Sequence, residues 1–288
     1  MQNEYSGNGR YSGVMMWPGS EFQYQGKTPT YVQIYNNTMP WNSRVDKIML
    51  WIKNSSQPAN LVFAYFEEPD KTSHMKGINS PDLKVQISRV DATVKYLLDK
   101  IKEENLENKM NLIILSDHGM DSVTNNRTIH LDQLISNKTY ESVISGPNGF
   151  ILPNPGKFEE IYQNLTRISN NLRTFSVYKK DELPVRWHMK NTSRLNGKLY
   201  ILAKPGYAFW NNLFEYIQNS TRSMTFESGT HGYDNEDPRM RAMFMASGPA
   251  FRKNTTGQPF DNVHVYPLIA NVLGLKEPAS GVRPDRTI

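Results

Sequence analysis

Apolar residues recur along the chain in two patterns, as short continuous runs and as runs at helical spacing. The continuous runs predict buried strands at 60–66, 111–115, 199–203 and 241–246. Helical spacing predicts helices at 41–53, 158–173 and 265–273, and most clearly from Pro81 to Ile101. The first 30 residues are rich in Gly, Tyr, Ser and Pro, so we expect a loop there. Strands that alternate with helices indicate an α/β protein.

Residues 60–115 form a predicted strand, helix and strand. Ser80 is a suitable N-cap for the helix, with Pro81 at its first position. Such a unit has parallel strands joined by a right-handed connection, so both strands end at the same edge of a sheet. We therefore expect Asp70 and Asp117, which follow the two strands, on one side of a sheet, where ligands gather in α/β folds.

Bulk composition restricts the possible functions. The 288 residues suit one large domain, and no linker divides them, so we predict a single domain over 1–288. The net charge is +5 without a dense Lys/Arg block, which argues against a nucleic-acid duplex as partner. The chain has no cysteine, which excludes disulfides and thiol catalysis. It also has no apolar run of 18 residues and no signal-peptide pattern at Met1, so we expect no membrane anchor within this chain.

The glycosylation acceptor pattern Asn-x-Ser/Thr occurs about twice as often as the composition predicts. The acceptor residues are Asn36, Asn54, Asn126, Asn137, Asn164, Asn191, Asn219 and Asn254. This excess favours an extracellular glycoprotein, either secreted or at the cell surface.

Three segments carry acids and histidines that suit a metal. They contribute Asp70 and His74, four residues apart in a predicted loop that could close around one ion, then Asp117 and His118, and finally His231. Carboxylate oxygens and imidazole nitrogens are ordinary ligands of Zn²⁺. Five ligands exceed what one catalytic zinc uses, so together they suit a two-metal site.

Each of these residues also has an ordinary structural interpretation. A lone Asp after a strand is usually a turn former, and a lone His in a loop is usually a surface residue. We interpret His130, His188 and His264 in that way. Glu67 and Glu68 are expected to lie around the site or in solvent rather than to bind metal.

The motifs also resemble those of a known family. They are Met16-Trp17-Pro18-Gly19-Ser20, Glu67-Glu68-Pro69-Asp70 with His74, Ser116-Asp117-His118-Gly119-Met120, the segment 229–235 and Ser247-Gly248-Pro249. In this order they resemble the ectonucleotide pyrophosphatase/phosphodiesterase family of the alkaline-phosphatase-like superfamily, and most of all its single-domain, membrane-anchored members. The resemblance covers essentially the whole chain. It implies a mixed, mostly parallel sheet flanked by helices, here incomplete at the N-terminus.

The resemblance also implies roles. Asp70, His74 and His231 resemble the ligands of one zinc, and Asp117 and His118 resemble two ligands of a second zinc. Tyr35 matches the aromatic residue that stacks on the nucleobase, and Trp17 and Pro18 match residues near it. Without the resemblance, packing would be the simpler interpretation of Tyr35 and Trp17. The implied reaction converts a nucleotide or dinucleoside polyphosphate to a nucleoside 5′-monophosphate through a covalent intermediate on a threonine.

Several family residues have no counterpart here. The family's remaining Asp ligand, its nucleophilic Thr and a phosphoryl-binding Asn all precede the Trp-Pro-Gly segment, which here begins at Trp17. The only acid before Trp17 is Glu4, and the first threonine is Thr28. We therefore expect an N-terminally truncated catalytic domain without a catalytic nucleophile, inactive by itself. A membrane anchor would belong to the full-length parent.

Two other classes of function stay open. The first is a non-catalytic glycoprotein module that retains the fold and binds a nucleotide. The second is a phosphomonoesterase, sulfatase or mutase relative, against which Trp17 and Tyr35 argue. The residues also leave open the preferred base, the leaving group and a choline-type phosphodiester as substrate.

Overall fold

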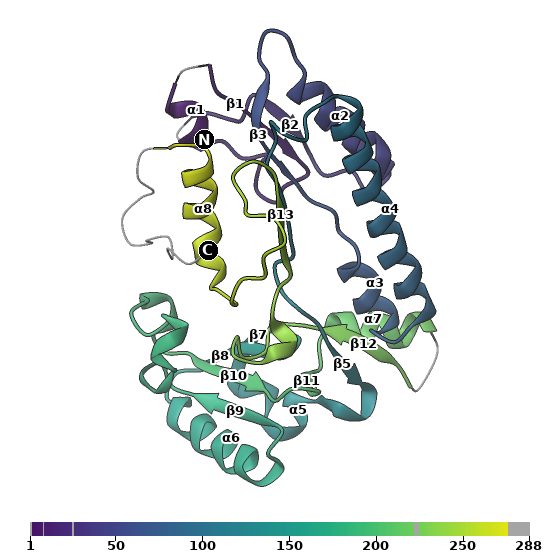
Figure 1. Ribbon diagram of the computed structural model, residues 1–288. Coiled ribbons are helices and arrows are strands. Elements are labelled where there is room, and N and C mark those ends of the chain that lie inside the picture. The colour runs from purple at the N-terminus through teal and green to yellow at the C-terminus, as the bar shows by residue number, and fades with distance from the viewer. Residues whose placement is uncertain (1, 8, 25, 222–224, 276–288) are drawn as a thin grey trace. The chain divides into compact units, whose positions relative to one another are not determined.

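The computed structural model describes residues 2–7, 9–24, 26–221 and 225–275 (Figure 1). They divide into two compact units. The first lies within 1–67, 88–114 and 244–288, and the second within 68–87 and 115–243. In these described ranges, no helix combines the length and the apolar character that crossing a membrane requires.

The first unit is built around a parallel sheet of strand order β2-β1-β3. Its elements are α1 (Gln2–Tyr5), β1 (Tyr11–Met15), β2 (Tyr31–Gln33), α2 (Trp41–Ile52), β3 (Ala59–Ala64), β4 (Leu112–Leu115), β13 (Phe244–Ser247), α8 (Val265–Val272) and most of α4 (Pro81–Glu103). Helix α2 packs on the sheet through Ile48 and Trp51, which join Met15 and Ala59 in one apolar cluster.

The second unit contains an antiparallel sheet of strand order β7-β8-β10-β9 and a separate pair, β12-β5. Its elements are α3 (Asp70–Lys76), β5 (Asp121–Thr124), β6 (Thr128–Ile129), α5 (Leu131–Leu134), β7 (Tyr140–Ser145), β8 (Asn148–Pro153), α6 (Phe158–Leu172), β9 (Phe175–Tyr178), β10 (Leu199–Ala203), β11 (Ala208–Phe209), α7 (Asn212–Thr221) and β12 (Glu227–Thr230). Helix α6 buries Ile161 and Leu165 against Phe175 of β9 and Leu199 of β10. This packing forms the core of the unit.

The α/β class is confirmed, with its parallel strands concentrated in the first unit and its antiparallel strands in the second. Helices α2, α4, α6 and α8 occur where helical spacing predicts them. Ser80 caps α4 as expected, because its Oγ accepts the Leu83 N–H at 3.2 Å.

Two predictions about strands are wrong. The first 30 residues are not loop, because β1 is the central strand of its sheet and pairs with both β2 and β3. Its Gly13, which favours a loop interpretation, leaves room for the Trp51 ring: a Cβ there would lie 2.7 Å from Trp51 Cε3. The two strands that flank α4 do not share a sheet, since β3 pairs with β1 and β4 pairs with β13.

Candidate metal centre

Helix α3 carries two of the five predicted ligands. Asp70 begins the helix and His74 follows one turn later, so both side chains lie on the same face. The prediction that this pair lies in a loop is wrong, because both residues lie in α3. The four-residue spacing still brings the two side chains close together, as expected. Residues four apart in a helix are neighbours on one face, so a helix places the carboxylate and the imidazole side by side, just as a closed loop would.

Strands β5 and β12 bring the other three candidates to the same place. They pair antiparallel, with Thr230 at the end of β12 opposite Asp121 at the start of β5. The residues just after β12 and just before β5 are therefore neighbours. These are His231 on one side, and Asp117 and His118 on the other.

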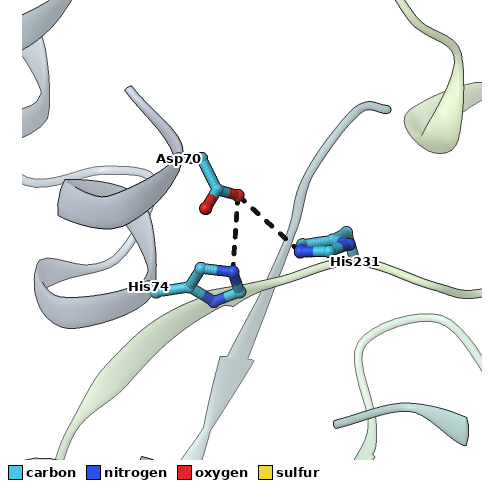
Figure 2. A group of neighbouring side chains, drawn as sticks. All are labelled: Asp70, His74 and His231. Atoms are coloured by element: carbon cyan, nitrogen blue, oxygen red, sulfur yellow. Dashed lines mark ion pairs between the residues drawn. The ribbon is translucent and has the colours of Figure 1, made fainter. Parts of the chain in front are cut away.

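Asp70, His74 and His231 converge on one point (Figure 2). Asp70 Oδ1 lies 3.4 Å from His74 Nε2 and 3.7 Å from His231 Nε2. The imidazole of His118 stacks on that of His231 with 3.5 Å between ring centroids. Asp117 Oδ2 lies 3.5 Å from His118 Nε2, so this pair adjoins the three-residue cluster through the stacked rings.

Backbone carbonyls orient two of the imidazoles. His74 Nδ1 lies 2.7 Å from the Gly229 carbonyl oxygen, and His118 Nδ1 lies 2.9 Å from the Gly119 carbonyl oxygen. A carbonyl oxygen can only accept a hydrogen bond, so each Nδ1 carries the proton. In the neutral form of such a ring Nε2 carries the lone pair, which is the form in which a histidine binds metal.

The residues fit a divalent cation. Asp70 Oδ1 is buried and has no hydrogen-bond partner, a costly arrangement for a carboxylate oxygen. Its nearest neighbours in the cluster are two imidazole nitrogens, and the ligand atoms of all three residues lie within 4.8 Å of one another. A cation at the point they share would satisfy the orphaned oxygen, and this donor set is typical of zinc.

Electrostatics differ among the three residues of the cluster: burial opposes the charged form of His74, but Asp70 and the Gly229 carbonyl raise the pKa of its imidazole. Burial opposes ionisation of Asp70, but the neighbouring His74, His231 and His118 hold the pKa of its carboxyl below the usual value. Burial, reinforced by His118 and His74, lowers the pKa of His231 to about 4. Asp70 is therefore charged and His231 neutral at physiological pH.

Comparison with known proteins identifies the family. The model of the type I phosphodiesterase / nucleotide pyrophosphatase family matches residues 1–234. The chain belongs to this family.

Named relatives agree with the family model. The chain is 38% identical to ectonucleotide pyrophosphatase/phosphodiesterase family member 5 of Homo sapiens, over 93% of this chain and 53% of that protein. It is 35% identical to a bis(5′-adenosyl)-triphosphatase of Xenopus laevis, over 93% of this chain and 56% of that protein. It therefore spans about half the length of these curated relatives.

A solved structure of a relative superposes closely on this fold. It is murine ectonucleotide pyrophosphatase/phosphodiesterase 5, described as an inactive threonine-to-alanine variant in complex with AMP. The TM-score is 0.85 at 36% identity, and the match covers 98% of this chain and 71% of the other. The predicted alkaline-phosphatase-like family and its α/β fold are thus confirmed.

The remaining predicted residues of this phosphodiesterase-family chain lie in the first unit. Trp17 contacts Phe63 with 4.9 Å between ring centroids and is 39% exposed, and Pro18 is exposed beside it. Tyr35 is 54% exposed. Both aromatic residues thus present ring surface to solvent, as residues that stack on a ligand must.

The two glutamates before Asp70 have structural partners, as expected of residues that do not bind metal. Glu67 accepts two hydrogen bonds from the buried Arg44, at 2.8 and 3.2 Å. Glu68 accepts the N–H of Thr72 at 2.9 Å, within the first turns of α3.

Arg186 was missed by sequence reasoning. It forms ion pairs with Asp234 at 2.5 Å and with Glu236 at 3.3 Å, and so secures the loop that follows His231. No motif connects residue 186 with this loop, because the contact spans about 50 residues and arises only in the folded chain.

Position 119 of this phosphodiesterase-family chain has no room for a side chain. A Cβ at residue 119 would lie 1.9 Å from the carbonyl oxygen of Arg239, and the Gly119 N–H bonds the Met240 carbonyl at 2.9 Å. We expect Gly119→Ala to lower the free energy of unfolding by about 1–3 kcal/mol, because backbone must move. Denaturant unfolding measures this change. Gly257→Ala, where the added Cβ meets nothing within 4 Å, is the control; equal stabilities of the two variants would contradict the prediction.

Proposed function

We propose that this chain is the larger part of a zinc-dependent phosphodiesterase. The intact enzyme would hydrolyse nucleotide phosphodiester or pyrophosphate bonds and release nucleoside 5′-monophosphates. The observation that carries the proposal is the convergence of Asp70, His74 and His231 on one point, with a buried carboxylate oxygen that lacks a partner. Membership in the phosphodiesterase family supports the choice of reaction.

Five side chains would hold two zinc ions. Asp70, His74 and His231 would bind the first, while Asp117 and His118 would supply two ligands to the second. Bound zinc would supply Lewis-acid chemistry that stabilises charge on phosphoryl oxygens. The chain's own contribution is orientation: the Gly229 and Gly119 carbonyls hold two imidazoles with Nε2 towards the site.

A nucleotide is the substrate class that these residues favour. An exposed aromatic face such as that of Tyr35 stabilises a stacked base by about 1–3 kcal/mol, which selects a nucleotide over a bare phosphodiester. A murine relative of this fold is described in complex with AMP as an inactive threonine-to-alanine variant. By analogy, a chain that lacks the nucleophile could still bind the nucleotide product.

Zinc-dependent binding of AMP tests this function. We expect isothermal titration calorimetry to detect AMP binding by the zinc-loaded chain and none after chelation, because the phosphate would bind the metal. Adenosine, which lacks the phosphate, should bind equally with and without zinc. Equal AMP binding in both metal states would contradict the proposal and favour a non-catalytic nucleotide-binding module.

We also propose that the parent protein is an extracellular glycoprotein. Seven of the eight acceptor asparagines are exposed, and the exception is Asn164, half-buried on α6 beside the buried Leu165. When the protein is expressed in a secreting eukaryotic cell, we expect glycan on exposed acceptors but not on Asn164, because a glycan is bulky and needs open surface. Peptide mass spectrometry after enzymatic deglycosylation measures occupancy. A glycan at Asn164, or none on any of the exposed acceptors, would contradict this expectation.

A further inference from the structure

The end of α3 is held by a residue far away in the sequence. The last carbonyls of a helix have no partner within it, and α3 has only seven residues. The Ser73 carbonyl accepts the N–H of Gly77 at 2.9 Å, but the carbonyl of His74 accepts instead from Ser228 Oγ, at 2.8 Å. Ser228 lies on β12 and is 0% exposed.

The next residue of β12 holds the imidazole of the same histidine. The Gly229 carbonyl accepts from His74 Nδ1 at 2.7 Å. A Cβ at residue 229 would lie 2.9 Å from the Ser73 carbonyl oxygen, so α3 rests directly on the backbone of the strand. Ser228 Oγ also lies 3.1 Å from the Gly229 carbonyl oxygen. One hydroxyl thus contacts both carbonyls that define the position of His74.

We propose that Ser228 is a positioning residue of the metal centre, fixing the His74 backbone so that its imidazole meets the Gly229 carbonyl and presents Nε2 towards Asp70. Ser228 does not itself reach the cluster. Its effect passes through the hydrogen bond that orients a ligand, and such bonds contribute to metal affinity. The inference rests on the proposed function, because it requires that the cluster binds zinc.

The test compares two serine-to-alanine variants on paired strands. Ser228→Ala removes the hydroxyl that contacts His74. Ser122→Ala on β5 removes a hydroxyl that bonds Glu227 Oε1 at 2.9 Å and does not contact His74, so it is the matched control. Both are made in the full 288-residue chain with Asp117→Ala, so that zinc binding is reported by the three-residue cluster. Competition with a chromophoric chelator gives zinc affinity, and ¹⁵N NMR of the imidazoles gives the tautomer of His74.

We expect Ser228→Ala to lower zinc affinity by about 10- to 100-fold. We also expect it to shift the His74 ring signals away from the pure Nδ1–H form, whereas Ser122→Ala should leave both readouts unchanged. If Ser228→Ala does not fold, Ser228→Cys retains the volume with a much weaker donor and should show the same losses. Wild-type affinity together with an unchanged tautomer in a folded Ser228 variant would overturn the inference. Failure of the parent chain itself to bind zinc would instead contradict the proposed function.

Discussion

Replacement of His231 by asparagine should weaken zinc binding at the three-residue cluster by at least about 100-fold. Loss of an outer hydrogen-bond partner of a metal ligand already costs about 10- to 100-fold in affinity, and loss of a ligand should cost more. The change removes the Nε2 that lies 3.7 Å from Asp70 Oδ1, and it also removes the ring that stacks on His118. Both candidate zinc positions should therefore be affected.

His188→Asn is the matched control for this experiment. His188 is exposed, and its φ of 55° lies in the left-handed region, which asparagine tolerates well. Zinc titration of both variants, with thermal unfolding to confirm that each is folded, gives the comparison. Equal affinities of the His231 and His188 variants would show that zinc binds elsewhere, and the assignment of the cluster would then be wrong.

The convergence of Asp70, His74 and His231 was more predictable than the elements that support it. Asp117 and His118 follow an apolar run after a single serine, and chemistry at the end of a strand can be recognised without knowing the rest of the fold. Helix α3 could not be predicted in this way, because seven residues are too few to be stable as a helix alone. Its support comes from Ser228 and Gly229, about 155 residues further along the chain.

Strand β1 shows the same limitation. Its sequence Tyr-Ser-Gly-Val-Met has neither alternation nor a long apolar run, and it is a strand because it lies between β2 and β3. Gly13 is required there by the Trp51 ring, a contact that local propensity does not include. Tertiary contacts of this kind override local preferences in strands.

The 288-residue chain should show no detectable hydrolysis of the p-nitrophenyl ester of TMP, even with zinc bound. The family resemblance implies a threonine nucleophile and a further aspartate ligand. The first acid and the first threonine of this chain, Glu4 and Thr28, do not supply them. Glu4 Oε1 accepts the Ser12 N–H at 2.7 Å, the Thr30 N–H at 2.9 Å and the Thr30 hydroxyl at 2.8 Å. Glu4 therefore has a structural role, since it joins the Ser12 and Thr30 segments of the first unit. Thr28 lies exposed in the same unit.

Release of p-nitrophenolate measures hydrolysis of the ester directly. The assay is run on the parent chain and on the His231→Asn variant. Turnover that zinc supports and His231→Asn abolishes would prove the prediction wrong, because it would require a nucleophile within this chain. Turnover that persists in the variant would come from a contaminating phosphodiesterase, since it would not depend on the cluster. Absence of turnover combined with zinc-dependent AMP binding would separate the two roles of the site: the cluster would suffice to hold the product, whereas bond cleavage needs a nucleophile that these 288 residues do not supply.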